Sequence, residues 1–92
     1  MKTRTAKIIP NGNGYCTDDY DDEDINIANI TRVGKIYERM RTYYIKLPCF
    51  DVSFSNDGFR TLYFLNMEDA IKERQKISEA IQRYEERIPI EV

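Results

Sequence analysis

Apolar and polar residues alternate with a period of two in the middle of the chain and with a period near 3.6 towards its C-terminus. Phe50, Val52 and Phe54 alternate with polar neighbours, as expected for a strand with one buried face. After Asn66 the apolar residues form one helical stripe: Met67, Ala70, Ile71, Ile77, Ala80, Ile81 and Tyr84. The two periods predict a sheet followed by an amphipathic helix.

The predicted helix has signals at both of its ends. Asn66 is a favourable N-cap residue, and Glu68 and Asp69 lie in the first turn, where the helix dipole favours acids. Pro89 stops the helix, because proline removes a backbone donor and clashes with the preceding turn. We therefore expect one long C-terminal helix.

Three segments before the helix are rich in strand-forming residues, namely 33–40, 41–47 and 59–65. Residues 56–58, Asn-Asp-Gly, predict a tight turn before the last of them. The predicted fold class is α+β: an antiparallel sheet of three or more strands packed against one long C-terminal helix.

Pro48 separates residues 41–47 from the alternating segment that follows. Proline cannot donate a ladder hydrogen bond, so it predicts a sheet edge, a bulge or a break. Side chains on a strand alternate between its faces. If Leu47 faces the helix, Lys46 therefore faces outward.

The first thirty residues differ from the rest in charge. Residues 1–30 carry three basic and six acidic side chains, whereas residues 31–92 carry eleven basic and ten acidic ones. Asn and Gly at positions 11–14 predict the turn of a hairpin. Six acids in seven positions at 18–24 repel one another, which predicts an exposed loop or flexible segment. We expect an N-terminal hairpin and acidic loop at 1–30 and a sheet-plus-helix domain at 31–92.

Length and composition narrow the class of protein. A chain of 92 residues forms one domain, and 41% hydrophobic residues is enough for a core. No apolar segment approaches the roughly 20 residues that cross a membrane, and no signal-peptide core follows the basic N-terminus. Two cysteines are too few for a disulfide scaffold, so we expect reduced thiols in a cytoplasmic protein.

The residue types disfavour catalysis. The chain has no histidine, which removes the commonest general base and the usual partner of a serine or cysteine nucleophile. Cys16 and Cys49 without histidine cannot form a standard structural zinc site. The acidic segment lacks the Gly and Glu spacing of a calcium loop. We expect a protein that is not an enzyme and uses no cofactor or metal.

Residues 34–84 resemble the three-stranded-sheet-plus-helix DNA-binding domain of plant ethylene-response factors, the Apetala-type domain, whose relatives occur in phage homing endonucleases and at the N-termini of some tyrosine integrases. The resemblance is carried by Tyr37-Glu38-Arg39, Tyr43-Tyr44-Ile45-Lys46-Leu47, Asn56-Asp57-Gly58, Arg60-Thr61-Leu62-Tyr63-Phe64 and Asn66-Met67-Glu68-Asp69-Ala70-Ile71-Lys72-Glu73-Arg74. It implies a phage or mobile-element protein that binds double-stranded DNA through the face of its sheet.

The resemblance also implies roles for individual side chains. Arg39 and Arg41 would contact base edges, and Tyr44 would stack or contact a sugar. The implied phosphate contacts come from basic residues: Lys46, Arg60, Arg32 and Lys35.

A second hypothesis follows from the charge, because a net of −2 is unusual for a DNA-binding domain. Small size, acidity and many tyrosines resemble the small anti-CRISPR inhibitors of phages. Such a protein would bind a nucleic-acid-handling protein such as a CRISPR effector, with the acidic segment imitating phosphates. The partner-binding residues would be Asp18, Asp19, Tyr20, Asp21, Asp22, Glu23 and Asp24. A homodimer through an exposed sheet edge is a third arrangement that the sequence leaves open.

Overall fold

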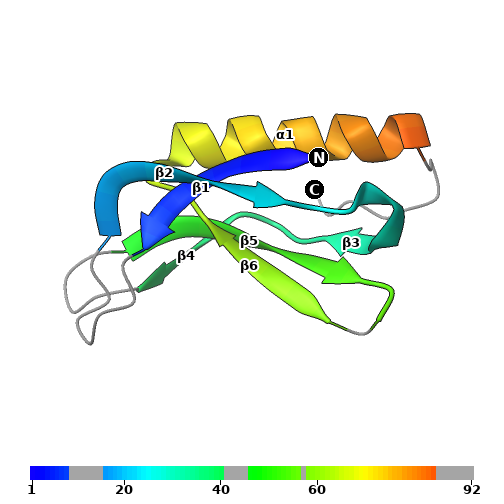
Figure 1. Ribbon diagram of the computed structural model, residues 1–92. Coiled ribbons are helices and arrows are strands. Elements are labelled where there is room, and N and C mark those ends of the chain that lie inside the picture. The colour runs from blue at the N-terminus through cyan, green and yellow to red at the C-terminus, as the bar shows by residue number, and fades with distance from the viewer. Residues whose placement is uncertain (9–15, 41–45, 57, 85–92) are drawn as a thin grey trace.

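The computed structural model describes residues 1–8, 16–40, 46–56 and 58–84, which form two antiparallel sheets and one helix (Figure 1). The elements in chain order are β1 (Lys2–Ile8), β2 (Cys16–Asp24), the 3₁₀ helix η1 (Ile27–Asn29), β3 (Ile30–Val33), β4 (Tyr37–Met40), β5 (Lys46–Phe54), β6 (Phe59–Tyr63) and α1 (Met67–Tyr84). This arrangement confirms the α+β class and the single long helix.

Strand β5 is the centre of the larger sheet. Strand β6 pairs with one of its edges, while β3 and β4 pair one after the other with its other edge, all antiparallel. The single strand expected at 33–40 is thus two strands, separated at residues 34–36. Residues 55 and 56 form a turn after β5, where the Asn and Gly at 56–58 predicted one, and Asp57 lies outside the described residues.

Pro48 does not break the sheet but lies inside β5, opposite Glu38 of β4. Its carbonyl accepts a hydrogen bond from the backbone N of Phe64 at 2.9 Å. The N and C=O of one strand residue point to the same side. The Pro48 nitrogen therefore points to the same side as its carbonyl, at a level beyond Tyr63. Because β6 ends at Tyr63, the backbone N–H that proline lacks removes no hydrogen bond between the two strands.

Continuous pairing through Pro48 reverses the expected facing of the residues before it. Leu47 shares a face with Cys49 and Asp51, whereas Lys46 shares the opposite face with Phe50. Phe50 belongs to the core beneath α1, so Leu47 faces away from the helix. The premise that Leu47 faces the helix, and with it the outward direction of Lys46, is wrong.

One hydrophobic core fills the space between the larger sheet and α1. Its buried members come from β3, β5, β6, α1 and the connecting segments: Ile25, Ile30, Val33, Phe50, Val52, Leu62, Phe64, Ala70, Ile77 and Ile81. The rings of Phe50 and Phe64 stack with centroids 5.3 Å apart and an angle of 13° between their planes. Burial of these aromatic and aliphatic side chains is the main force that holds α1 on the sheet.

Asn66 caps α1 as expected, because its side-chain oxygen accepts a hydrogen bond from the backbone N of Asp69 at 2.8 Å. The buried stripe is narrower than the apolar pattern implied, since Met67 and Ile71 are 42% and 52% exposed. Glu73 is buried instead, and its carboxylate forms an ion pair with Lys76 at 3.0 Å.

The prediction of an exposed loop or flexible segment at residues 18–24 is wrong, because these residues lie in β2. Strand β1 supplies basic partners: Lys2 lies opposite Asp24, and Arg4 lies opposite Asp22. Opposite charges on facing positions stabilise a strand pair by about 0.2–1 kcal/mol each. Alternation also divides the acids between two faces, which reduces their mutual repulsion.

The β1–β2 hairpin packs against the larger sheet and the helix. Strand β1 lies next to β6, and its inward-pointing Thr3 and Thr5 are buried. The hydroxyl of Tyr20 donates to the Asp69 carboxylate of α1 at 3.0 Å. The backbone N of Ile25, just after β2, donates to the carbonyl of Met1 at 2.8 Å, which closes the end of the hairpin.

Candidate functional site

The larger sheet has one face covered by α1 and a second face, here called the outer face, turned away from it. Because directly paired residues share a face, the register assigns the outer face to Arg32, Tyr37, Arg39, Leu47, Cys49, Asp51, Ser53, Phe59, Thr61 and Tyr63. Leu47 and Cys49 are buried at one end, whereas Phe59 at the other end is 70% exposed. The accessible part of the outer face therefore surrounds Asp51 and Phe59.

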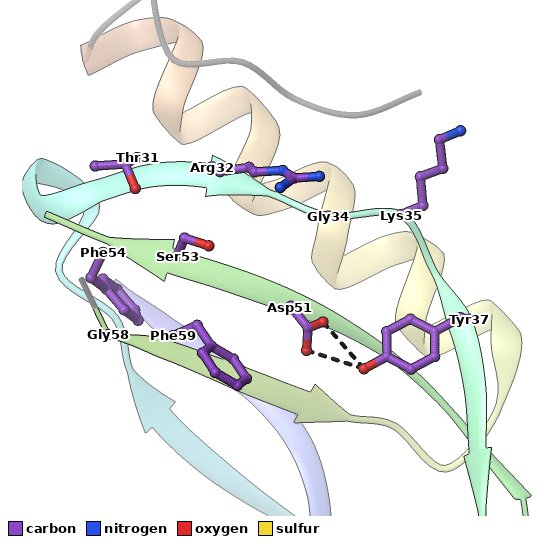
Figure 2. Close-up of a pocket in the computed structure, with 10 residues that line it drawn as sticks. All are labelled: Thr31, Arg32, Gly34, Lys35, Tyr37, Asp51, Ser53, Phe54, Gly58 and Phe59. Carbon is purple, nitrogen blue, oxygen red and sulfur yellow. Dashed lines mark hydrogen bonds between the residues drawn. The ribbon is translucent and has the colours of Figure 1, made fainter.

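A groove of about 590 Å³ runs along this accessible part. Its lining residues are Thr31, Arg32, Gly34, Lys35, Tyr37, Asp51, Ser53, Phe54, Gly58 and Phe59 (Figure 2). The rings of Phe54 and Phe59 lie at one end, and the hydrogen-bonded pair Tyr37 and Asp51 lies at the other. The side chain of Lys35 leads away from the groove at its rim.

The groove forms where β3 and β4 separate, and Gly34 is the residue that permits it. The backbone N of Gly34 donates to the carbonyl of Asp51 at 2.8 Å. A Cβ at position 34 would lie 3.3 Å from the same oxygen, closer than ordinary van der Waals contact. The Arg74 side chain of α1 donates to the Gly34 carbonyl at 2.8 Å, so the rim of the groove is attached to the helix.

Asp51 is the centre of a hydrogen-bond network in the groove. Its carboxylate accepts from the Thr61 hydroxyl at 2.5 Å and from the Tyr37 hydroxyl at 3.2 Å to each oxygen. The three side chains come from β5, β6 and β4, so the network ties the three strands together on the outer face. It also holds the Tyr37 ring in one position at the wall of the groove.

Two groups in this network have raised pKa values. The pKa of Tyr37 is raised from 10.0 to about 12, chiefly by burial and in smaller part by the neighbouring Cys49 and Asp51. Burial is also the main cause that raises the pKa of the Cys49 thiol, against the opposing charge of Arg39. Both groups therefore stay protonated at neutral pH, which disfavours the nucleophilic thiolate at Cys49.

Phe59 is one of the residues of this site that sequence patterning did not identify. Among the described residues it is the most exposed large hydrophobic side chain, at 70%, and Tyr37 across the groove is 39% exposed. The alternation of side chains along a strand could have identified it. Phe59 lies three positions before the core residue Leu62, so the two side chains point to opposite faces. An exposed ring on a sheet face is a surface on which a flat ligand can stack.

The structure brings part of the predicted basic set to the outer face. Arg32 lies opposite Ser53 and lines the groove, as does Lys35. Arg39 is exposed two residues beyond Tyr37 on the same face of β4. Arg32 and Lys35 line the β3–β4 side of the groove, and Arg39 lies beyond its Tyr37 end; the three are here called the basic border.

The other predicted contacts lie elsewhere or outside the described residues. Lys46 and Arg60 belong to the helix-side face of the sheet, not to the outer face. The Arg60 guanidinium also forms an ion pair with Glu23 of β2 at 3.0 Å. Arg41 and Tyr44 lie outside the described residues.

The acidic strand β2 is a second polar surface, on the hairpin. The side chains of Asp19, Tyr20, Asp21, Asp22 and Asp24 are exposed, that of Glu23 is half-buried, and that of Asp18 lies outside the described residues. Within the described ranges, no three acidic or cysteine side chains come together as a group that would hold a metal ion.

Tyr20 has a structural role within this surface. The Arg4 guanidinium lies 3.6 Å from the centre of the Tyr20 ring, which is a cation–π distance. The hydrogen bond that its hydroxyl donates to Asp69 is the main cause that raises the pKa of Tyr20. The ring and the hydroxyl therefore both attach the hairpin to the rest of the fold.

The described part of the chain has no helix that combines the length and the apolar character needed to cross a membrane. No family model, curated protein sequence or solved structure matches this chain, so the likeness to the Apetala-type domain and the likeness to anti-CRISPR inhibitors stay predictions.

Proposed function

We propose that this is a non-enzymatic protein of a phage or mobile element that binds DNA through the outer face of its sheet, in the cytoplasm. The observation that carries the proposal is the groove, where two accessible aromatic rings, Phe59 and Tyr37, lie beside a basic border. Basic side chains neutralise phosphates, and aromatic rings contact sugars and bases. The Asp51 network holds three strands of the sheet together, so the basic and aromatic side chains keep their arrangement when DNA binds.

The test is fluorescence anisotropy of labelled DNA at about 50 and 200 mM salt, a range over which several phosphate contacts change affinity steeply. We expect binding that weakens with salt and that falls in the double variant Arg32→Ala, Arg39→Ala. The matched control is Lys72→Ala, Arg83→Ala, which removes the same charge from exposed positions on α1. An equal loss in both variants, or no binding by the wild type at the lower salt, would contradict the proposal.

A second candidate function is supported by the extended acidic strand. The exposed carboxylates of Asp19, Asp21, Asp22 and Asp24 follow one another along the extended strand β2. Such a row can imitate a phosphate backbone and bind the basic channel of a nucleic-acid-handling protein. On this proposal the protein inhibits a CRISPR effector by occupying its nucleic-acid site.

Inhibition of DNA cleavage by RNA-guided nucleases tests the second candidate. Asp19→Asn, Asp21→Asn should abolish inhibition, whereas the control Glu68→Gln, Glu79→Gln on α1 should retain it. The two candidates use different surfaces, so the arginine variants of the outer face separate them. Pairing of two copies through a sheet edge would show in the same preparations as a doubled mass in solution.

A further inference from the structure

We propose that the nucleic acid bound by the outer face is single-stranded, with one unpaired base stacked on Phe59 inside the groove. The inference rests on the proposed DNA-binding function and narrows it, because the sequence resemblance implied a duplex. It follows from the chemistry of Phe59, from the charge around the groove and from the shape of the groove.

Phe59 offers a contact that a duplex cannot use well. Its side chain is 70% exposed although it lies on the face of a sheet. In a double helix each base is covered on both flat sides by its neighbours, and only base edges reach the grooves. An unpaired base presents its flat side to an aromatic ring, and one such stack is worth about 1–3 kcal/mol.

The charge of the protein also favours a single strand over a duplex, because the single strand carries less negative charge. Proteins that bind duplexes tightly make many phosphate contacts, often about 6–10. Among the described residues, the basic border contributes three cationic side chains, Arg32, Lys35 and Arg39, and the carboxylate of Asp51 lies in the same groove. The whole chain has a net charge of −2 and carries the acidic strand β2. A single strand has half the charge of a duplex of equal length, so it is repelled less.

The dimensions of the groove suit a nucleotide. A volume of about 590 Å³ lies within the roughly 300–1,000 Å³ of sites that enclose small ligands. Phe59 and Asp51 are diagonal neighbours on paired strands, which places them about 7–8 Å apart. A base on Phe59 therefore lies beside the polar wall of Asp51, Tyr37 and Ser53, and Asp51 directs the phosphates outward to the basic border.

The experiment compares one labelled oligonucleotide of about 12 nucleotides, within the range of single-strand sites, with the same oligonucleotide annealed to its complement. The RNA strand of the same sequence is a third probe. We expect both single strands to bind at least about tenfold more tightly than the duplex. Phe59→Ala should weaken single-strand binding about 5- to 150-fold, the range for one lost stack, and Phe59→Tyr should retain it. Ile71→Ala on α1 removes an apolar side chain of similar accessibility and should leave binding unchanged.

The outcomes separate this inference from the proposal on which it rests. If the duplex binds as tightly as the single strands, or if Phe59→Ala binds single strands like the wild type, the inference is overturned while DNA binding stands. If neither form binds at about 50 mM salt, the proposed function fails and the inference fails with it. Tight binding of the single DNA strand, lost in Phe59→Ala and kept in Phe59→Tyr, supports both, whereas binding of the RNA strand alone would contradict the proposed DNA binding.

Discussion

The Asp51 network predicts that two hydroxyl deletions on the same carboxylate will have unequal costs. Thr61 donates to Asp51 at 2.5 Å, a distance typical of a charge-assisted O–H···O⁻ bond. Tyr37 donates at 3.2 Å to each oxygen, which is longer than the usual range for a hydroxyl donor. Hydrogen bonds to charged groups contribute about 1.5–3 kcal/mol. The Tyr37 bonds go to the same carboxylate, but their length lowers their contribution to that of ordinary hydrogen bonds, about 0.5–1.5 kcal/mol.

We therefore expect Thr61→Val to lower the free energy of unfolding by about 1.5–3 kcal/mol and Tyr37→Phe by about 0.5–1.5 kcal/mol. Valine keeps the branched shape and the strand preference of threonine, so the change isolates the hydroxyl. Urea denaturation measures both losses, with the slope of the transition unchanged if the unfolded state is unaffected. In an Asp51→Asn background the loss from Thr61→Val should shrink, because the acceptor is then neutral.

The expected order, with the larger loss of stability from Thr61→Val, can be contradicted in two ways. A loss from Thr61→Val no larger than that from Tyr37→Phe would show that the short bond is not the stronger one. An unchanged loss in the Asp51→Asn background would show that the charge of the carboxylate contributes nothing to the bond.

Two further predictions concern the core and the alkaline titration. Phe50→Ala removes a ring that is fully buried and stacked on Phe64, so urea denaturation should show a loss of about 3–5 kcal/mol. The control Met67→Ala, at a position 42% exposed, should stay within about 0.5 kcal/mol of the wild type, and similar losses in the two variants would contradict the assigned core. The pKa of Tyr37 is raised to about 12, so its contribution to stability is complete below about pH 10 and is lost as the pH rises through about 12. Phenolate absorbance should show a late-ionising tyrosine that is missing in Tyr37→Phe; loss of an early-ionising one instead would contradict the shift.

Local signals predicted the helix well. The start of α1 depends on Asn66 and on residues within one turn of it, and the 3.6-residue period lies within the helix itself. The same pattern overestimated the buried stripe, because Met67 and Ile71 meet no covering layer while Glu73 does. Which part of an amphipathic stripe is buried depends on the shape of the surface beneath it.

Non-local pairing explains the predictions that were wrong. Taken alone, the acidic residues of β2 predict a loop. They form a strand because the basic residues Lys2 and Arg4 lie opposite them on β1. The condition that Leu47 faces the helix fails, because β5 pairs with β4 without interruption at Pro48 and so places Leu47 on the face of Cys49. Only the positions of the neighbouring strands decide that Pro48 lies inside a strand.

The sequence by itself determined the α+β class, the helix with its N-cap and the turn before β6, because caps, periods and turn residues act within a few positions of the chain. It also supplied the basic residues from which Arg32, Lys35 and Arg39 came. Only the tertiary structure decided that Arg32 and Lys35 line one groove with Arg39 beyond its end, that Arg60 pairs with Glu23, and that Phe59 is exposed. The reason is that strand register, which sets the face of every side chain in a sheet, is fixed between segments distant in the chain.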